Sequence, residues 1–72
     1  MKTYYADMSG KLLALVEARI KEYHLPVHLQ YGVPYEEYDE TLMHPITMDY
    51  PDDFDLNGEL LLPCVDKLIL KL

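Results

Sequence analysis

The apolar side chains of segment 9–25 recur at steps of three and four residues, and no other feature of this chain constrains its fold as much. These side chains fall on one face of an α-helix. They are Leu12, Leu13, Val16, Ile20 and Tyr23. Ser9 or Asp7 can cap the start of this helix. Pro26 ends it at or before Leu25, because the residue before a proline disfavours the helical conformation.

Two segments after the helix alternate between apolar and polar residues, which is typical of half-buried strands. In the segment 27–31, Val27, Leu29 and Tyr31 share one face, and Gly32-Val33-Pro34 closes the strand. The segment 46–50 alternates in the same way until Pro51. We therefore expect two short strands here.

The stretch from Pro34 to Pro45 predicts a second, shorter helix over 35–43. Pro34 suits the first position of a helix, where its missing N–H is not needed. Tyr35, Tyr38 and Leu42 would share its apolar face, and acidic residues in its first turn would favour the helix dipole. His44-Pro45 would end it.

Asn57-Gly58 is a strong hairpin signal, because both residues tolerate positive φ. The paired arms would be 54–56 and 59–62. The apolar tail 64–72 fits both a helix and a strand, since periodicity cannot decide so short a run. Pro63 at its start favours the helix.

Together these elements predict a small α+β fold over a single domain, residues 1–72, with residues 1–8 free to be flexible. The long N-terminal helix would pack on a short, mainly antiparallel sheet made from 27–31, 46–50 and the Asn57-Gly58 hairpin. The short helix over 35–43 would lie in the middle of the chain.

The size of the chain argues against an enzyme. A core built from 72 residues leaves little room for a substrate pocket, which commonly takes about 300 Å³ or more. Ser9 has no evident base beside it, and Cys64 has no basic neighbour in the sequence to lower its pKa. We expect a binding module that has no catalytic residue and needs no cofactor or bound metal.

Cys64 is the only cysteine, so no disulfide can form within the chain. A reducing compartment fits this, and residues 1–5 lack the apolar run of a signal peptide. No apolar stretch is long enough to span a bilayer. We expect a cytoplasmic protein.

The most unusual feature of composition is a one-sided charge distribution. The segment 31–60 contains nine acidic residues and no Lys or Arg, whereas the whole chain has a net charge of −7. These acids are Glu36, Glu37, Asp39, Glu40, Asp49, Asp52, Asp53, Asp55 and Glu59. Such a surface repels nucleic acid and anionic lipid, and it favours a basic partner.

Tyrosines lie among the acids, and an arginine can both pair with a carboxylate and stack on a tyrosine ring. We therefore expect a small acidic module that docks on a basic surface of a larger protein. Basic surfaces are most common on polymerases, nucleases and DNA-binding regulators, which the module would inhibit or regulate. Small inhibitors encoded by phages or mobile elements have this general character. The expected contacts are Glu36, Glu37, Asp39, Glu40, Asp49, Asp52, Asp53 and Asp55, with Tyr35, Tyr38 and Tyr50 as anchors.

Two alternatives remain open at this point. Asp53, Asp55 and Asn57, followed by Gly58, match the first half of an EF-hand-like calcium loop, but Cys64 stands where the closing glutamate is needed. Alternatively, the apolar segment 60–72 could bury itself in a homo-oligomer, which would make the protein a structural subunit.

Overall fold

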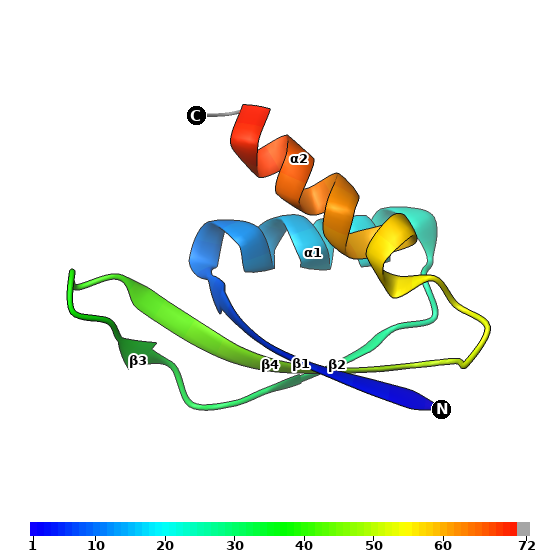
Figure 1. Cartoon of the computed structure of the whole chain (residues 1–72), viewed down its shortest axis with the longest axis horizontal. Coiled ribbons are helices and arrows are strands. Elements are labelled where there is room, and N and C mark those ends of the chain that lie inside the picture. Colours follow the sequence, from blue (N-terminus) through cyan, green and yellow to red (C-terminus); the bar gives the residue numbers. More distant parts are fainter. Residues whose placement is uncertain (71–72) are drawn as a thin grey trace.

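Two helices cover one face of a four-stranded antiparallel sheet in the computed structural model, which describes residues 1–70 (Figure 1). The elements in chain order are β1 (Lys2–Ser9), α1 (Gly10–Tyr23), β2 (His28–Tyr31), β3 (Tyr35–Glu36), β4 (Leu42–Tyr50), the π-helical turn η1 (Asn57–Leu61) and α2 (Leu62–Leu70). This arrangement confirms the predicted α+β fold.

β4 is the central strand, with β1 on one side and β2 on the other. β1 pairs with β4 along its whole length, from Lys2 opposite Tyr50 to Ser9 opposite Met43. The short β3 places Tyr35 opposite Met43, on the side of β4 that β2 also occupies. Both outer strands are antiparallel to β4, so β1 and β2 are parallel to each other and α1 makes the crossover between them.

The core lies between the sheet and the helices. Alternation along β4 directs Ile46 and Met48 toward the helices, and both are fully buried. α1 contributes Leu13 and Val16, and the C-terminal helical region contributes buried residues of its own. The buried set is Met8, Leu13, Val16, Ile46, Met48, Leu56, Leu60 and Cys64.

The predicted long helix is confirmed, including its start. The Ser9 hydroxyl accepts a hydrogen bond from the Leu12 N–H at 3.3 Å, which satisfies one of the free donors of the first turn. At the other end His24 adopts a left-handed conformation with φ of 52°, and its N–H bonds to the Ile20 carbonyl. Pro26 follows and prevents a further turn.

The predicted strands 27–31 and 46–50 are present as β2 and as part of β4, but the helix predicted over 35–43 is wrong. That segment forms β3, a turn in which Glu40 has φ of 68°, and the first residues of β4. A helix of this length is marginal by itself. As part of a strand, Leu42 pairs with Glu36 of β3, and Met43 pairs with both Tyr35 of β3 and Ser9 of β1.

His44-Pro45 was predicted to end an element, and this is wrong, because both residues lie inside β4. A proline in a central strand normally removes a ladder hydrogen bond. Here the Pro45 carbonyl accepts from the Gly32 N–H at 2.8 Å. The Pro45 nitrogen, which carries no hydrogen, therefore also faces the segment around Gly32. Gly32-Val33-Pro34 separates β2 from β3 there, and the ladder is already interrupted.

The hairpin predicted at Asn57-Gly58 is also wrong, because these residues begin the C-terminal helical region. The Asp55 carboxylate accepts from the Gly58 N–H at 3.1 Å, and the Asp55 carbonyl accepts from the Glu59 N–H at 2.9 Å. This local cap starts a helix at the position where a hairpin turn was predicted. The helical interpretation of the tail is confirmed for Leu62–Leu70, and residues 71–72 lie outside the described part.

Residues 1–8, for which flexibility was expected, supply most of β1. Toward the end of β1 every second side chain is directed into the core: Ala6 is half-buried and Met8 is buried. The first residues of the chain therefore belong to the sheet.

Candidate functional site

Because both helices lie on one face of the sheet, the opposite face is uncovered (Figure 1). Side chains alternate along each strand, so the pairing register identifies those directed away from the helices. We call them the open sheet face: Thr3, Tyr5 and Asp7 of β1, His28 and Gln30 of β2, Tyr35 of β3, and Met43, Pro45, Thr47 and Asp49 of β4.

Asp49 ties three strands together on this face. Its Oδ1 accepts from the Thr3 hydroxyl at 2.7 Å, and its Oδ2 accepts from the Gln30 amide nitrogen at 2.7 Å. The donors lie on β1 and β2, on either side of β4. The carboxylate therefore has two fixed partners and holds its charge at the centre of one end of the open sheet face.

Tyr35 and Asp7 meet at the other end of this face. Tyr35 lies on β3 and Asp7 on β1, so their side chains approach each other across β4. The pKa of the Tyr35 phenol is raised, first by loss of hydration and then by the Asp7 carboxylate as hydrogen-bond partner and negative charge. The register places an aromatic ring and a carboxylate on either side of β4, beside Met43 and Pro45.

The described basic side chains lie on one side of the sheet, whereas acidic side chains lie on both sides. Of the basic side chains in residues 1–70, Lys11, Arg19 and Lys21 lie on α1 and Lys67 on α2. Lys2 shares the face of β1 that carries Ala6 and Met8, which is the face directed toward the helices. Within the described residues, the open sheet face therefore has two carboxylates and no Lys or Arg.

The predicted acidic contacts form two groups, one at each end of β4. Glu36, Glu37, Asp39 and Glu40 lie on β3 and in the turn that joins it to β4. Asp52, Asp53 and Asp55 follow β4 at its other end, and Figure 1 shows these connections at opposite ends of the sheet. The nine residues of β4 separate the two groups by roughly 26 Å. The acidic stretch is therefore continuous in sequence but divided in space.

Several of these acids have partners within the fold. Asp39 Oδ1 accepts from the Thr41 N–H at 3.1 Å, and hydrogen bonds from Thr41 lower the pKa of the Asp39 carboxyl. Asp52 Oδ1 lies 2.9 Å from the Met1 amine, with both groups exposed. Asp55 caps the C-terminal helical region. Glu36 of β3 and Glu37 and Glu40 of the turn have exposed side chains.

The predicted tyrosine anchors differ in their exposure. Tyr38 is fully exposed in the β3–β4 turn, and Tyr35 lies at the open sheet face. Tyr50 is half-buried against Phe54, with the ring centroids 6.3 Å apart in an edge-to-face arrangement. Only part of the Tyr50 ring is therefore available to a partner.

Sequence reasoning missed Tyr5 and Asp7. Tyr5 is 74% exposed at the middle of β1, beside Thr47. The signal was present, because residues 3–8 alternate between Thr3, Tyr5 and Asp7 on one face and Tyr4, Ala6 and Met8 on the other. No β1 strand was predicted, so neither residue was placed on a surface.

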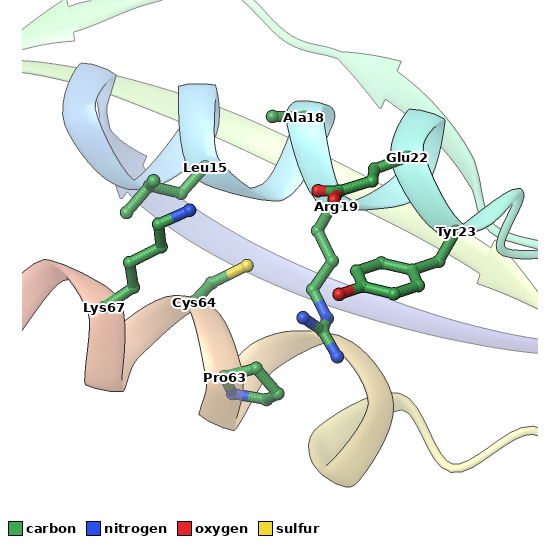
Figure 2. Close-up of a pocket in the computed structure, with 8 residues that line it drawn as sticks. All are labelled: Leu15, Ala18, Arg19, Glu22, Tyr23, Pro63, Cys64 and Lys67. Carbon is green, nitrogen blue, oxygen red and sulfur yellow. The ribbon is translucent and has the colours of Figure 1, made fainter.

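A cleft of about 160 Å³ lies between α1 and α2, lined by Leu15, Ala18, Arg19, Glu22, Tyr23, Pro63, Cys64 and Lys67 (Figure 2). The Arg19 guanidinium lies 4.5 Å from the centre of the Tyr23 ring, and Arg19 Nε donates to the Glu59 carbonyl. Burial raises the pKa of the Cys64 thiol, although nearby Arg19 and Lys67 act in the opposite direction. The thiol is therefore held in its unreactive, protonated form.

The residues of the calcium alternative are placed at the start of a helical region. Asp55 and Gly58 are joined by the capping hydrogen bond, and Asn57 begins η1. Within residues 1–70, no cluster of three or more His, Cys, Asp or Glu side chains has the geometry to hold a metal ion.

Over the same described range, no helix is both long and apolar enough to cross a bilayer. Comparison of the chain with protein-family models, curated proteins and solved structures finds no match.

Proposed function

We propose that this protein is a binding module that docks its open sheet face on a basic surface of a larger protein. The observation that carries the proposal is the absence of Lys and Arg from the open sheet face within residues 1–70. Asp7 and Asp49 lie on the open sheet face, and further acids lie at both ends of β4. The described Lys and Arg side chains lie on the helices or, in the case of Lys2, on the face of β1 directed toward them.

The chemistry of the face fits arginine-rich targets. Tyr5 and Tyr35 offer aromatic rings to a guanidinium, and the Asp7 carboxylate, on the same strand as Tyr5, can accept its N–H groups. The two acidic groups at the ends of β4 would steer a basic partner during diffusional encounter, since exposed charges act mainly on the association rate.

We extend the proposal to the partner class expected from the sequence. Basic protein surfaces are most common where nucleic acid is handled, so the module would occupy such a surface on a polymerase, nuclease or DNA-binding regulator and inhibit or redirect it. It would act through occupancy, with no catalytic step and no direct contact with nucleic acid. The proposed compartment is the cytoplasm, in keeping with the free, buried Cys64.

The test is a capture experiment with two charge-matched variants. Asp7→Asn with Glu37→Gln neutralises two carboxylates at the open sheet face and its adjoining turn. Glu22→Gln with Asp66→Asn makes the same charge change on α1 and α2. We expect the first variant to lose a basic partner at least tenfold while the second retains it, with the difference shrinking at raised salt. Equal capture by both variants would contradict the proposal.

A second candidate, a homo-oligomeric subunit, is favoured by one specific observation. α2 exposes apolar side chains on the face directed away from the core: Leu62 (58%), Val65 (37%), Ile69 (59%) and Leu70 (85%). A partner copy could cover them. Sedimentation decides this cheaply, because a strict monomer at high protein concentration excludes it. If an oligomer forms, Ile69→Asp should dissociate it.

A further inference from the structure

We propose that the bound part of the partner is an extended basic segment that pairs with the free edge of β1 and adds a fifth strand to the sheet. This inference rests on the proposed function and specifies how the partner binds. It follows from the backbone of β1, the contrast between the two sheet edges, and the charge around them.

β1 presents an unpaired strand edge. Its eight residues pair with β4 in unbroken register, and within residues 1–70 no other strand pairs with it. Residues along a strand direct their N–H and C=O groups alternately to its two sides. Half of the β1 backbone groups therefore point away from β4, in the arrangement that binds an added strand.

The opposite edge of the sheet is protected against strand addition, so β1 is the edge at which an added strand can pair. β2 has four residues and β3 has two, with Gly32-Val33-Pro34 between them. The two strands are too short and too interrupted to offer a continuous row of outward N–H and C=O groups, and Pro34 has no N–H. Interruptions and prolines of this kind block strand addition. β1 contains no proline and no bulge.

The side chains of β1 suit a basic occupant. An added strand would place alternate side chains beside Thr3, Tyr5 and Asp7, and opposite charges on neighbouring strands are favourable. Tyr5 is 74% exposed, so its ring is free to stack on an arginine of the added strand. Asp7 supplies the carboxylate for a second one.

A second copy of this chain is the less suitable occupant of the edge. Each chain has a net charge of −7, so pairing two copies would bring two strongly acidic molecules together. A basic segment reduces the same charge. Electrostatic complementarity therefore favours a different, basic chain.

The experiment uses an eight-residue probe peptide in which arginine and valine alternate. Two controls accompany it: the same peptide N-methylated at alternate residues, which keeps the charge but removes the N–H groups of one edge, and a peptide with glutamate in place of arginine. Binding is followed by amide hydrogen exchange of the whole protein. We expect the probe to slow exchange in β1 and not in β2. Methylation should weaken binding at least tenfold, and the glutamate peptide should not bind.

Each other outcome has a definite meaning. If the methylated and unmethylated peptides bind equally to the open sheet face, edge pairing is overturned while the proposed docking on basic chains stands. If the arginine peptide does not bind at millimolar concentration, edge pairing is again overturned, and the charge-matched capture experiment judges the function separately. If β1 is protected by raising the protein concentration alone, a second copy is the occupant, and the inference is wrong.

Discussion

Arg19 donates its Nε–H to the backbone carbonyl oxygen of Glu59 at 2.6 Å. In a regular α-helix that carbonyl would accept from the residue four positions later, which is Pro63 and has no N–H. The π turn η1 lies just before this proline, where the Leu62 N–H bonds to the Asn57 carbonyl. Arg19 thus supplies the donor that the helix lacks, and Figure 2 shows its side chain reaching from α1 toward the helix that carries Pro63.

This relationship predicts that the cost of losing Arg19 depends on Pro63. Arg19→Met removes the donor and leaves the Glu59 carbonyl without its partner, which should lower the free energy of unfolding by about 1 kcal/mol. Pro63→Ala restores a backbone N–H four residues after Glu59. In that background Arg19→Met should cost clearly less. Urea unfolding of the four proteins measures the difference.

The Tyr23 contact is the control for this cycle. The guanidinium lies 4.5 Å from the Tyr23 ring centre, so Arg19→Met also removes a cation–π contact. That loss is the same with either residue at position 63 and cancels in the cycle. A coupling of zero between Arg19 and Pro63 would show that the hydrogen bond to Glu59 does not compensate for the proline.

The cap at Asp55 predicts a second measurable effect. Asp55→Ala removes the acceptor of the Gly58 N–H, and losing such a cap typically costs about 1 kcal/mol. Asp55→Asn keeps an oxygen acceptor and should retain most of the stability. Asp53→Ala, two residues earlier and exposed, is the matched control and should change little. Thermal unfolding separates these variants, and equal losses for Asp53→Ala and Asp55→Ala would contradict the capping role.

The elements that could be predicted from the sequence are those stabilised by local interactions. The helix α1 was predictable because its apolar period, the Ser9 cap and Pro26 all lie within one segment. β1 was not, because it is stabilised by pairing with β4, more than thirty residues away. At Asn57-Gly58 the hairpin signal competed with a cap from Asp55, two residues earlier, and the cap prevailed.

The candidate site was predictable in chemistry but not in shape. The acids and tyrosines were identified from composition, yet their division between the two ends of β4 depends on the pairing register. Tyr5 and Asp7 were missed for the same reason, since their face is defined only once β1 pairs with β4. Charge is a property of the segment, whereas the surface that displays it is a property of the sheet.

Cys64 should react slowly in the folded protein. Its side chain is buried, and burial raises the pKa of the thiol, so little thiolate is present near neutral pH. We expect iodoacetamide to modify the native protein at least tenfold more slowly than the urea-unfolded chain at pH 8. Mass spectrometry over time measures both rates. Comparable rates would mean that the thiol is accessible and ionised in the native state.

The Tyr31–Glu17 hydrogen bond predicts an alkaline loss of stability. The Tyr31 hydroxyl donates to Glu17 Oε2 at 2.6 Å, and this bond is the first cause of the raised pKa of the phenol, ahead of lost hydration and the charge of Glu17. The folded pKa is higher than the unfolded one. The contribution is therefore complete below the unfolded value of about 10 and is lost as the pH rises through the folded pKa.

Tyr31→Phe removes both the hydrogen bond and the titration. The difference in melting temperature between wild type and Tyr31→Phe should be constant from pH 7 to about 9.5 and should shrink above pH 10, because only wild type has this phenol to ionise. Tyr38→Phe, at a fully exposed ring, controls for the loss of a tyrosine hydroxyl. A difference that stays constant through pH 11, or that Tyr38→Phe reproduces, would remove the Tyr31–Glu17 bond from the explanation.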